Sequence, residues 1–258
     1  MRTLDLFDLR GQVAMVTGAS SGLGVWFSRG LAELGAGVVL AARRAERIET
    51  LASELRGLGV KALAVPTDVT SEEQVQNLVD RTLKAFGRID ILVNNAGMGV
   101  DEGKAEDQPL SVFRQVHEVN LMGTVICCQR IGRVMLAQGE GRIINVSSVH
   151  AERADRMDHS WAYCSSKAAV LNLTRELGHK WAPRGVHVNG IAPGLFPTEM
   201  TEWYFEDPGR EAEVMGSIPL HRVGNEDDIK GIIAFLASPA SDYVIGHTIV
   251  MDGGQTLA

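Results

Sequence analysis

The sequence predicts an α/β protein built on a doubly wound, seven-stranded and mostly parallel sheet with helices on both faces. Short apolar runs rich in β-branched residues alternate with longer segments of helical period, which is typical of successive βαβ units. The runs are apolar throughout, as expected for strands that are covered on both faces. With 258 residues, of which 45% are hydrophobic, the chain can fill one such core, and we expect a single domain over residues 1–258.

Seven apolar runs are the candidate strands, and segments of helical period lie between them. Several of these segments start at a capping residue, such as Thr70 or Ser71, and end at a glycine, such as Gly87. The expected strands are 12–17, 37–42, 60–66, 89–94, 142–147, 186–192 and 247–250, and the expected helices lie near 22–34, 44–57, 71–86, 109–138, 161–182 and 226–237.

Two stretches break this alternation, residues 149–160 and residues 195–222. Both are mixed in composition, and both follow a candidate strand. Open parallel sheets bind their ligands beyond the carboxyl ends of the strands. We therefore expect these two stretches to be loops that surround a substrate.

Charge and cysteine content narrow the class of protein. The formal net charge is −7, and no run of basic residues is longer than Arg43-Arg44, which argues against nucleic acid or a membrane surface as a partner. The three cysteines lack metal-ligand spacing, so we expect no metal site and a reducing compartment. No signal-like start and no apolar stretch of membrane-spanning length is present, and we expect a cytoplasmic protein.

A glycine-rich turn, Thr17–Gly24, follows the first candidate strand and opens the first helix. Gly18 allows a tight turn, Gly22 leaves room for a pyrophosphate, and Gly24 lets the helix pack close to the strand, with the helix N-terminal amides facing the anion. The spacing G-x-x-x-G-x-G departs from the common G-x-G-x-x-G. Its position between strand and helix predicts a dinucleotide site in a Rossmann-like domain; the alternative is a plain strand-to-helix turn.

The pattern Thr-Gly-x-x-x-Gly-x-Gly resembles that of the short-chain dehydrogenase/reductase family. Other motifs of this family follow in family order, so that the resemblance covers nearly the whole chain, from Gly11 to Gly254. They are Asn94-Asn95-Ala96-Gly97, Asn120, Ser148, Tyr163-Cys164-Ser165-Ser166-Lys167, Pro193-Gly194 with Thr198, and Asp252-Gly253-Gly254. The resemblance implies an oxidoreductase that uses a nicotinamide cofactor.

The end of the second strand bears on the choice of cofactor. An acidic residue there would hold the ribose 2′-hydroxyl of NAD, whereas an arginine accommodates the 2′-phosphate of NADP. By the family's pattern, Ala42 stands where NAD-specific members carry Asp, and Arg43 stands where many NADP-specific members carry a basic residue. We predict NADP(H) in preference to NAD(H). The alternative is that Arg43, Arg44 and Arg47 form the solvated first turn of a helix.

The resemblance also implies the remaining cofactor contacts. Asp68 would close the adenine end of the pocket, or it only caps the next helix. Thr198 would bind the nicotinamide carboxamide, with helix capping again the alternative. The full set of cofactor positions is Gly18, Ser20, Ser21, Gly22, Leu23, Gly24, Arg43, Arg44, Asp68, Val69, Asn95, Ala96, Gly97, Tyr163, Lys167, Pro193, Gly194 and Thr198.

Tyr163 and Lys167 are four residues apart, which places them on one face of a helix. A free phenol titrates at about 10, too high for efficient proton exchange at neutral pH, and a nearby ammonium together with a positively charged nicotinamide would lower that pKa. The resemblance implies that Tyr163 is the general acid/base. Oxidation of an alcohol and reduction of a ketone are the two directions of the same reaction.

Two further catalytic candidates come from the resemblance. Ser148 would position the reacting oxygen; we prefer it to Ser147 because the family serine commonly precedes a small apolar residue, here Val149. Ser148 and Tyr163 are about two residues further apart than in the family, which indicates a small insertion in the 149–160 loop. Asn120 would hold a water that links Lys167 to solvent, and the alternative is a buried asparagine satisfied by its neighbours.

The two loops limit the substrate only broadly. His150, Arg153, Arg156 and His159 are polar, whereas Phe196, Trp203, Tyr204 and Phe205 could form an apolar lid, so a carbonyl compound with an apolar part and an anionic end is conceivable. The 193–201 segment is similar to that of some 3-oxoacyl reductases, which favours a 3-oxoacyl-type ketone. The alternatives are a sugar or polyol dehydrogenase and, in another class, a non-catalytic nucleotide sensor. The expected substrate contacts are Ser148, His150, Tyr163, Phe196 and Trp203.

The helices near 109–138 and 161–182 are small or apolar around much of their circumference, which indicates burial on more than one side. The resemblance implies that they pair across a dimer and that the last strand assists a tetramer. We expect a homotetramer, or otherwise a homodimer. Cys127 and Cys128 are expected to be core residues.

Overall fold

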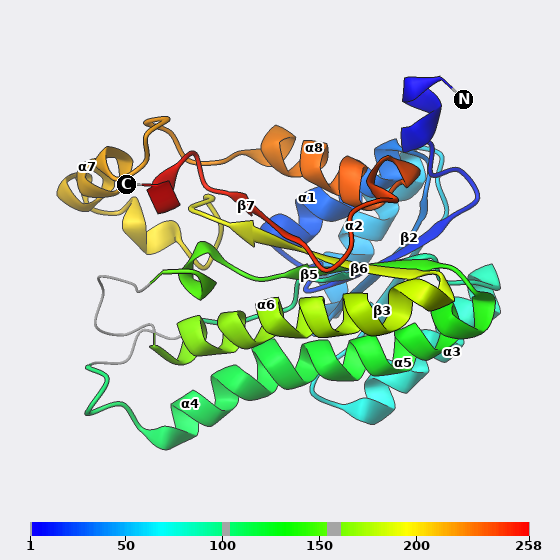
Figure 1. Cartoon of the computed structure of the whole chain (residues 1–258), viewed down its shortest axis with the longest axis horizontal. Coiled ribbons are helices and arrows are strands. Elements are labelled where there is room, and N and C mark those ends of the chain that lie inside the picture. The colour runs from blue at the N-terminus through cyan, green and yellow to red at the C-terminus, as the bar shows by residue number, and fades with distance from the viewer. Residues whose placement is uncertain (1, 100–103, 154–160, 258) are drawn as a thin grey trace.

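In a computed structural model, residues 2–99, 104–153 and 161–257 are described, and their centre is one seven-stranded sheet (Figure 1). All six pairs of neighbouring strands are parallel. The strand order is β3-β2-β1-β4-β5-β6-β7, so the chain changes direction across the sheet between β1 and β4. The predicted doubly wound, Rossmann-like fold is therefore confirmed. The strands are β1 (Val13–Thr17), β2 (Gly37–Ala42), β3 (Ala62–Pro66), β4 (Ile91–Asn94), β5 (Gly141–Val146), β6 (Val186–Pro193) and β7 (Thr248–Met251).

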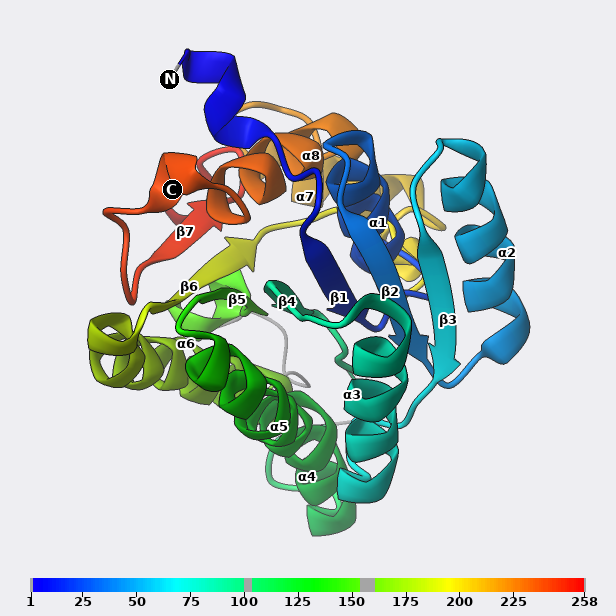
Figure 2. The same cartoon turned by 90° about the vertical axis from the view of Figure 1, so that its right-hand side faces the viewer.

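Helices cover both faces of the sheet (Figure 2). One face carries α1 (Leu23–Glu33), α2 (Ala45–Gly57) and α8 (Glu226–Leu236), and the other carries α3 (Glu72–Phe86), α5 (Gly123–Gln138) and α6 (Trp161–Trp181). Strand β1 shows why its residues are apolar throughout. Ala14 and Val16 belong to the core under α1, α2 and α8, whereas Val13 and Met15 belong to the core under α3 and α5. Successive side chains alternate between the two faces, and both faces are covered.

The ends of the helices follow the expected capping chemistry. The hydroxyl of Ser71, rather than of Thr70, caps α3 by accepting from the Gln74 N–H at 3.3 Å. The same helix ends at Gly87, whose φ of 81° is the left-handed conformation that favours glycine.

Two regions differ in detail from the expected elements. The long helix near 109–138 consists of α4 (Leu110–His117), a π-helical turn (Glu118–Met122) and α5. The region 195–222, expected to be a loop, contains α7 (Pro208–Gly216). Asp207 caps this helix by accepting from the Arg210 N–H at 2.8 Å, and proline occupies the first helical position. The Asp-Pro pair is a helix-start signal that our sequence analysis did not use.

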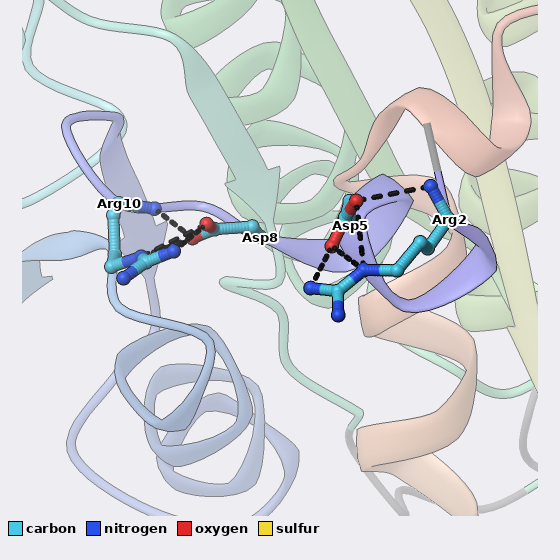
Figure 3. Close-up of polar contacts among 4 residues, drawn as sticks. All are labelled: Arg2, Asp5, Asp8 and Arg10. Atoms are coloured by element: carbon cyan, nitrogen blue, oxygen red, sulfur yellow. Dashed lines mark hydrogen bonds and ion pairs between the residues drawn. The ribbon is translucent and has the colours of Figure 1, made fainter.

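The N-terminal segment lies on the surface and carries two exposed ion pairs, Arg2 with Asp5 at 2.9 Å and Arg10 with Asp8 (Figure 3). Exposed pairs of this kind contribute little to stability. Leu9, between Asp8 and Arg10 in the sequence, is fully buried, and its N–H donates to the Leu34 carbonyl at 3.0 Å. The segment is thus held to the end of α1 by Leu9 rather than by its charges.

Within the residues that the structure describes, none of the helices combines the length and the apolar character needed to cross a bilayer. Cys127 and Cys128 are buried in the core between α5 and the sheet, as expected. Burial raises the pKa of the Cys128 thiol to about 12.

Candidate active site

The loops that follow the carboxyl ends of the strands surround a cavity of about 1250 Å³. Its wall includes the glycine-rich turn, the end of β2, the segment after β4, and residues Ser148, Tyr163 and Lys167. All the site residues expected from the sequence line this cavity except Gly24 and Asn120, which lie behind it. The sheet therefore brings together, in one place, expected site residues that are up to 185 positions apart, from Gly18 to Trp203.

Glycine is required at two positions of the glycine-rich turn because neighbouring atoms leave no room. A Cβ on Gly24 would lie 2.3 Å from the Gly18 carbonyl oxygen, and one on Gly18, whose φ is 65°, would lie 2.8 Å from the Ala96 Cα. The Asn95 side chain fixes the turn from the opposite side by donating to the carbonyls of Thr17 at 3.0 Å and Gly18 at 3.2 Å. The turn is thus held rigidly against the segment after β4.

The end of β2 presents cations and no carboxylate. Ala42 is buried, whereas Arg43 is exposed on the cavity wall and forms no ion pair within the described part of the chain. Asp68 lines the same cavity as Arg43. Its pKa is lowered by the hydrogen bond from the Thr70 N–H, and to a smaller degree by the charge of Arg43.

Arg44 connects the glycine turn to the loop after β6. Its guanidinium donates to the hydroxyls of Ser20 at 3.0 Å and Ser21 at 2.5 Å, and to the Glu199 carboxylate at 2.8 Å. Arg47 also pairs with Glu199. Hydrogen bonds from Arg44 and Arg47 lower the pKa of Glu199 to about 2, so that this carboxylate is charged at neutral pH. The sequence held no periodicity or motif that pointed to Glu199.

Tyr163 and Ser148 share a hydrogen bond although they come from α6 and from the end of β5. Burial raises the pKa of the Tyr163 phenol, and the hydrogen bond with Ser148 lowers it by a smaller amount. Desolvation thus penalises the phenolate more strongly than the hydrogen bond with Ser148 stabilises it. The lower pKa that we expect from the ammonium together with a positively charged nicotinamide stays a prediction for the enzyme with its cofactor bound.

Lys167 is buried one helical turn beyond Tyr163. Its Nζ donates to the Val146 carbonyl at 2.8 Å and lies 5.7 Å from the centroid of the Tyr163 ring. Only 4% of the residue is exposed, and burial lowers its pKa to about 8. The last carbonyl of β5 therefore holds the ammonium beside the phenol.

The geometry separates the two serine candidates. The hydroxyl of Ser147 donates to the main-chain carbonyl of Lys167 at 2.9 Å, which turns it toward the α6 backbone. The hydroxyl of Ser148 contacts Tyr163 and also accepts from the His150 N–H at 3.2 Å. Ser148 is thus the serine that faces the phenol.

Asn120 lies within the π-helical turn and is fully buried. Its side chain accepts from the Met98 N–H at 2.8 Å and donates to the Met98 carbonyl at 2.9 Å and to the Ser166 hydroxyl at 3.0 Å. These bonds give the amide three protein partners. A Cβ on Gly97 would lie 3.3 Å from both the Asn120 Oδ1 and the Lys167 Nζ, so the two groups approach the same glycine.

The expected substrate residues divide into two kinds. The His150 ring lies 6.4 Å from the Tyr163 ring, and Trp203, which stacks on Tyr204 at 3.8 Å, lines the cavity. Phe196 is 4% exposed and packs edge-on against Trp26, so most of its surface fills the core. Arg156 and His159 lie outside the described residues. Arg210 and Gln255 line the cavity as well, and the sequence analysis did not single them out.

The described residues contain no group of three metal-ligating side chains.

A glycine-rich turn at the direction change of a parallel sheet, with a Ser-Tyr-Lys group beside it, defines an NAD(P)-dependent oxidoreductase that acts on hydroxyl and ketone groups. A family model described as enoyl-(acyl carrier protein) reductase matches residues 18–256. The chain belongs to the short-chain dehydrogenase/reductase family, in agreement with the resemblance of its motifs.

Known proteins are similar over the whole chain. Cis-4-hydroxycyclohexanecarboxylate dehydrogenase of Sinomonas cyclohexanicum is 38% identical over 249 residues, 95% of this chain and 96% of that protein. The 3-oxoacyl-[acyl-carrier-protein] reductase of Synechocystis sp. is 36% identical over 255 residues, 96% and 98% of the two chains. A gluconate 5-dehydrogenase from Burkholderia cenocepacia, solved in complex with NADP and tartrate, is 37% identical, with a TM-score of 0.94 and both chains fully covered.

Proposed function

We propose that the protein is an NADP(H)-dependent oxidoreductase that interconverts a ketone and a secondary alcohol, with Tyr163 as the general acid/base. The observation that carries the proposal is the grouping of Ser148, Tyr163 and the buried Lys167 on the wall of the cavity that also holds the glycine-rich turn. When bound, the nicotinamide supplies a hydride to the carbonyl carbon or accepts one from the alcohol carbon.

Each side chain then has a defined task. In reduction, Tyr163 gives its proton to the carbonyl oxygen, and in oxidation it takes the proton of the hydroxyl group. Ser148 donates a hydrogen bond to the same oxygen and so stabilises the charge that develops on it. Lys167 holds a positive charge next to the phenol and favours its ionised form. Asn120 supports the Met98 segment beside Lys167, which makes it a positioning residue.

The preference for NADP(H) rests on Arg43 and on the absence of an acidic side chain at Ala42. The glycine turn lines the cavity, and Arg43 is a cation on the wall of the same cavity without an ion-pair partner in the described chain. A guanidinium can hold a phosphate by two parallel hydrogen bonds. Arg44 already binds Glu199, so a phosphate reaching Arg44 must compete with that carboxylate.

Two classes of substrate are candidates for the cavity. A 3-oxoacyl group fits the apolar side of the cavity, where Leu195, Met200 and Trp203 lie. A sugar acid or polyol is the second candidate, and two of the relatives described above are named for hydroxy acids, gluconate and cis-4-hydroxycyclohexanecarboxylate. A sensor without catalysis would not need the Ser148, Tyr163 and Lys167 arrangement.

Consumption of NADPH with a panel of ketones, repeated with NADH, tests the proposal. The panel contains acyl thioesters, cyclic ketones, oxo acids and ketoses. We expect turnover with at least one ketone and a lower Kd for NADPH than for NADH. Cofactor binding without turnover of any ketone or alcohol would favour the sensor, and a preference for NADH would mean that Arg43 is only a surface charge.

We also propose a cytoplasmic homotetramer in which α5 and α6 pair with their copies across a dimer interface. These helices run side by side along one face of the molecule (Figure 1), and α6 is apolar around much of its circumference. Sedimentation equilibrium tests the assembly. A homodimer would still agree with pairing of α5 and α6 across an interface, whereas a monomer would contradict both this pairing and the tetramer.

A further inference from the structure

Arg153 lines the same cavity as Ser148 and Tyr163. We call the part of the cavity near these residues and the 195–222 segment its substrate side. A tight turn connects Arg153 to the catalytic serine. The Ala151 N–H donates to the Ser148 carbonyl at 3.0 Å, and the Arg153 N–H donates to the Val149 carbonyl at 3.3 Å. The backbone of Arg153 is therefore held one turn away from the residue that follows Ser148.

The guanidinium of Arg153 forms a hydrogen bond through Nη1, whereas its Nε has no hydrogen-bond partner among the described residues. Its Nη1 donates to the Gln255 carbonyl at 2.8 Å, which ties it to the C-terminal segment. Its Nε is shielded from solvent and has no hydrogen-bond partner, and Arg153 forms no ion pair with any carboxylate of the described chain. Buried donors are nearly always paired in native proteins. Among the described residues, no acceptor pairs with this edge of the guanidinium.

Asp252 is near enough to interact with the charge of Arg153, but its carboxylate is already used. Its two oxygens accept from the N–H groups of Gly254 at 2.8 Å and Thr256 at 2.7 Å. Arg210, another described arginine that lines the cavity, donates to the Trp203 carbonyl at 2.6 Å, and its guanidinium lies over the Trp203 ring at 5.1 Å. Arg153 thus differs from Arg210 in having a buried donor without a partner among the described residues.

We propose that Arg153 binds a carboxylate group of the substrate, so that the enzyme acts on oxo acids and the corresponding hydroxy acids. The inference rests on the proposed function, because it needs Tyr163 and Ser148 at the reacting oxygen. A planar guanidinium edge matches a carboxylate in a two-point hydrogen bond, and a single arginine balances a single negative charge. The same cavity has apolar lining residues, Leu195 and Met200 among them, which suit a short hydrocarbon spacer.

The test compares pairs of substrates that differ only in this charge. Oxo acids with chains of increasing length, 4-oxocyclohexanecarboxylate, and the carboxamide of each are reduced with NADPH by the full-length enzyme and by Arg153→Gln, Arg153→Lys and Arg210→Gln variants. For at least one acid we expect kcat/KM to exceed that of its amide by roughly tenfold to a hundredfold, the range for a charged hydrogen bond. In Arg153→Gln this ratio falls to about one through KM, while kcat and the Kd for NADPH stay within about threefold.

The two control variants make the test specific. Arg153→Lys keeps the charge and restores part of the preference for the acid, whereas Arg210→Gln leaves the preference unchanged. An acid-to-amide ratio that is the same in Arg153→Gln as in the native enzyme, or that is lost in Arg210→Gln instead, would overturn the assignment. Turnover of neutral ketones with no preference for any acid would overturn it as well and leave the proposed function intact. Failure to reduce any ketone would count against the proposed function itself.

Discussion

The hydroxyl of Ser147 donates to the main-chain carbonyl of Lys167 at 2.9 Å, whereas the next residue, Ser148, shares a hydrogen bond with Tyr163. Neighbouring serines at the end of one strand therefore face different elements. Ser147 ties β5 to the backbone of α6, and Ser148 faces the cavity. This difference leads directly to the first prediction.

Ser148→Ala should lower kcat by about 10² to 10³-fold, the effect of removing one donor to a developing oxyanion. Ser147→Ala should leave kcat within about threefold and lower the free energy of unfolding by about 1 kcal/mol, because it removes one buried hydrogen bond. Steady-state kinetics and urea unfolding of both variants measure the two effects. A larger loss of kcat in Ser147→Ala than in Ser148→Ala would mean that Ser147, and not Ser148, stabilises the reacting oxygen.

The buried ammonium of Lys167 should make stability depend on pH in the alkaline range. Its folded-state pKa of about 8 lies below the ordinary value of 10.5. Below about pH 8 the folded state therefore bears the full cost of burying the charge, and this cost is relieved as the pH rises toward the unfolded pKa.

Lys167→Met carries no such charge and supplies the reference for that prediction. Between about pH 7 and pH 9.5 the unfolding free energy of the cofactor-free native protein should rise by about 2 kcal/mol relative to this variant. Urea unfolding of both proteins at the two pH values gives the difference. A constant difference would mean that Lys167 titrates near its ordinary pKa.

Glu199 should weaken the binding of NADPH because it occupies donors of Arg44 and Arg47 and brings a negative charge to the phosphate end of the cavity. Glu199→Gln should lower the Kd for NADPH by roughly three- to tenfold, in line with the modest energy of an exposed ion pair. Titration calorimetry measures the change. Glu49→Gln is the matched control, since Glu49 pairs with Arg56 elsewhere on α2; equal effects of the two variants would remove the specific role of Glu199.

Much of the fold could be predicted because its signals are local. Strand β1 is apolar at every position since both faces of the sheet are covered, and the α3 cap and Gly87 are side-chain and backbone effects within a few residues. The glycine turn could be placed for the same reason. The close contact of Gly24 with the Gly18 carbonyl then supplies the physical basis for the motif.

The parts that were missed depend on contacts between distant segments. Glu199 and Arg44 are 155 positions apart, and nothing in either local sequence indicates their ion pair. The raised pKa of Tyr163 follows from burial by the assembled loops, which the i, i+4 spacing of Tyr163 and Lys167 does not reveal. By contrast, α7 had a local signal at Asp207 and Pro208 that was overlooked.

The central claim is that the Tyr163 hydroxyl exchanges the proton of the reacting oxygen. The most direct measurement is the single-turnover rate of ketone reduction by Tyr163→Phe with saturating NADPH, together with the Kd for NADPH. We predict a rate lower by roughly 10² to 10⁴-fold and a Kd within about threefold of the native value, since the variant removes only the hydroxyl. A variant that reduces the ketone at more than about a tenth of the native rate would contradict the account.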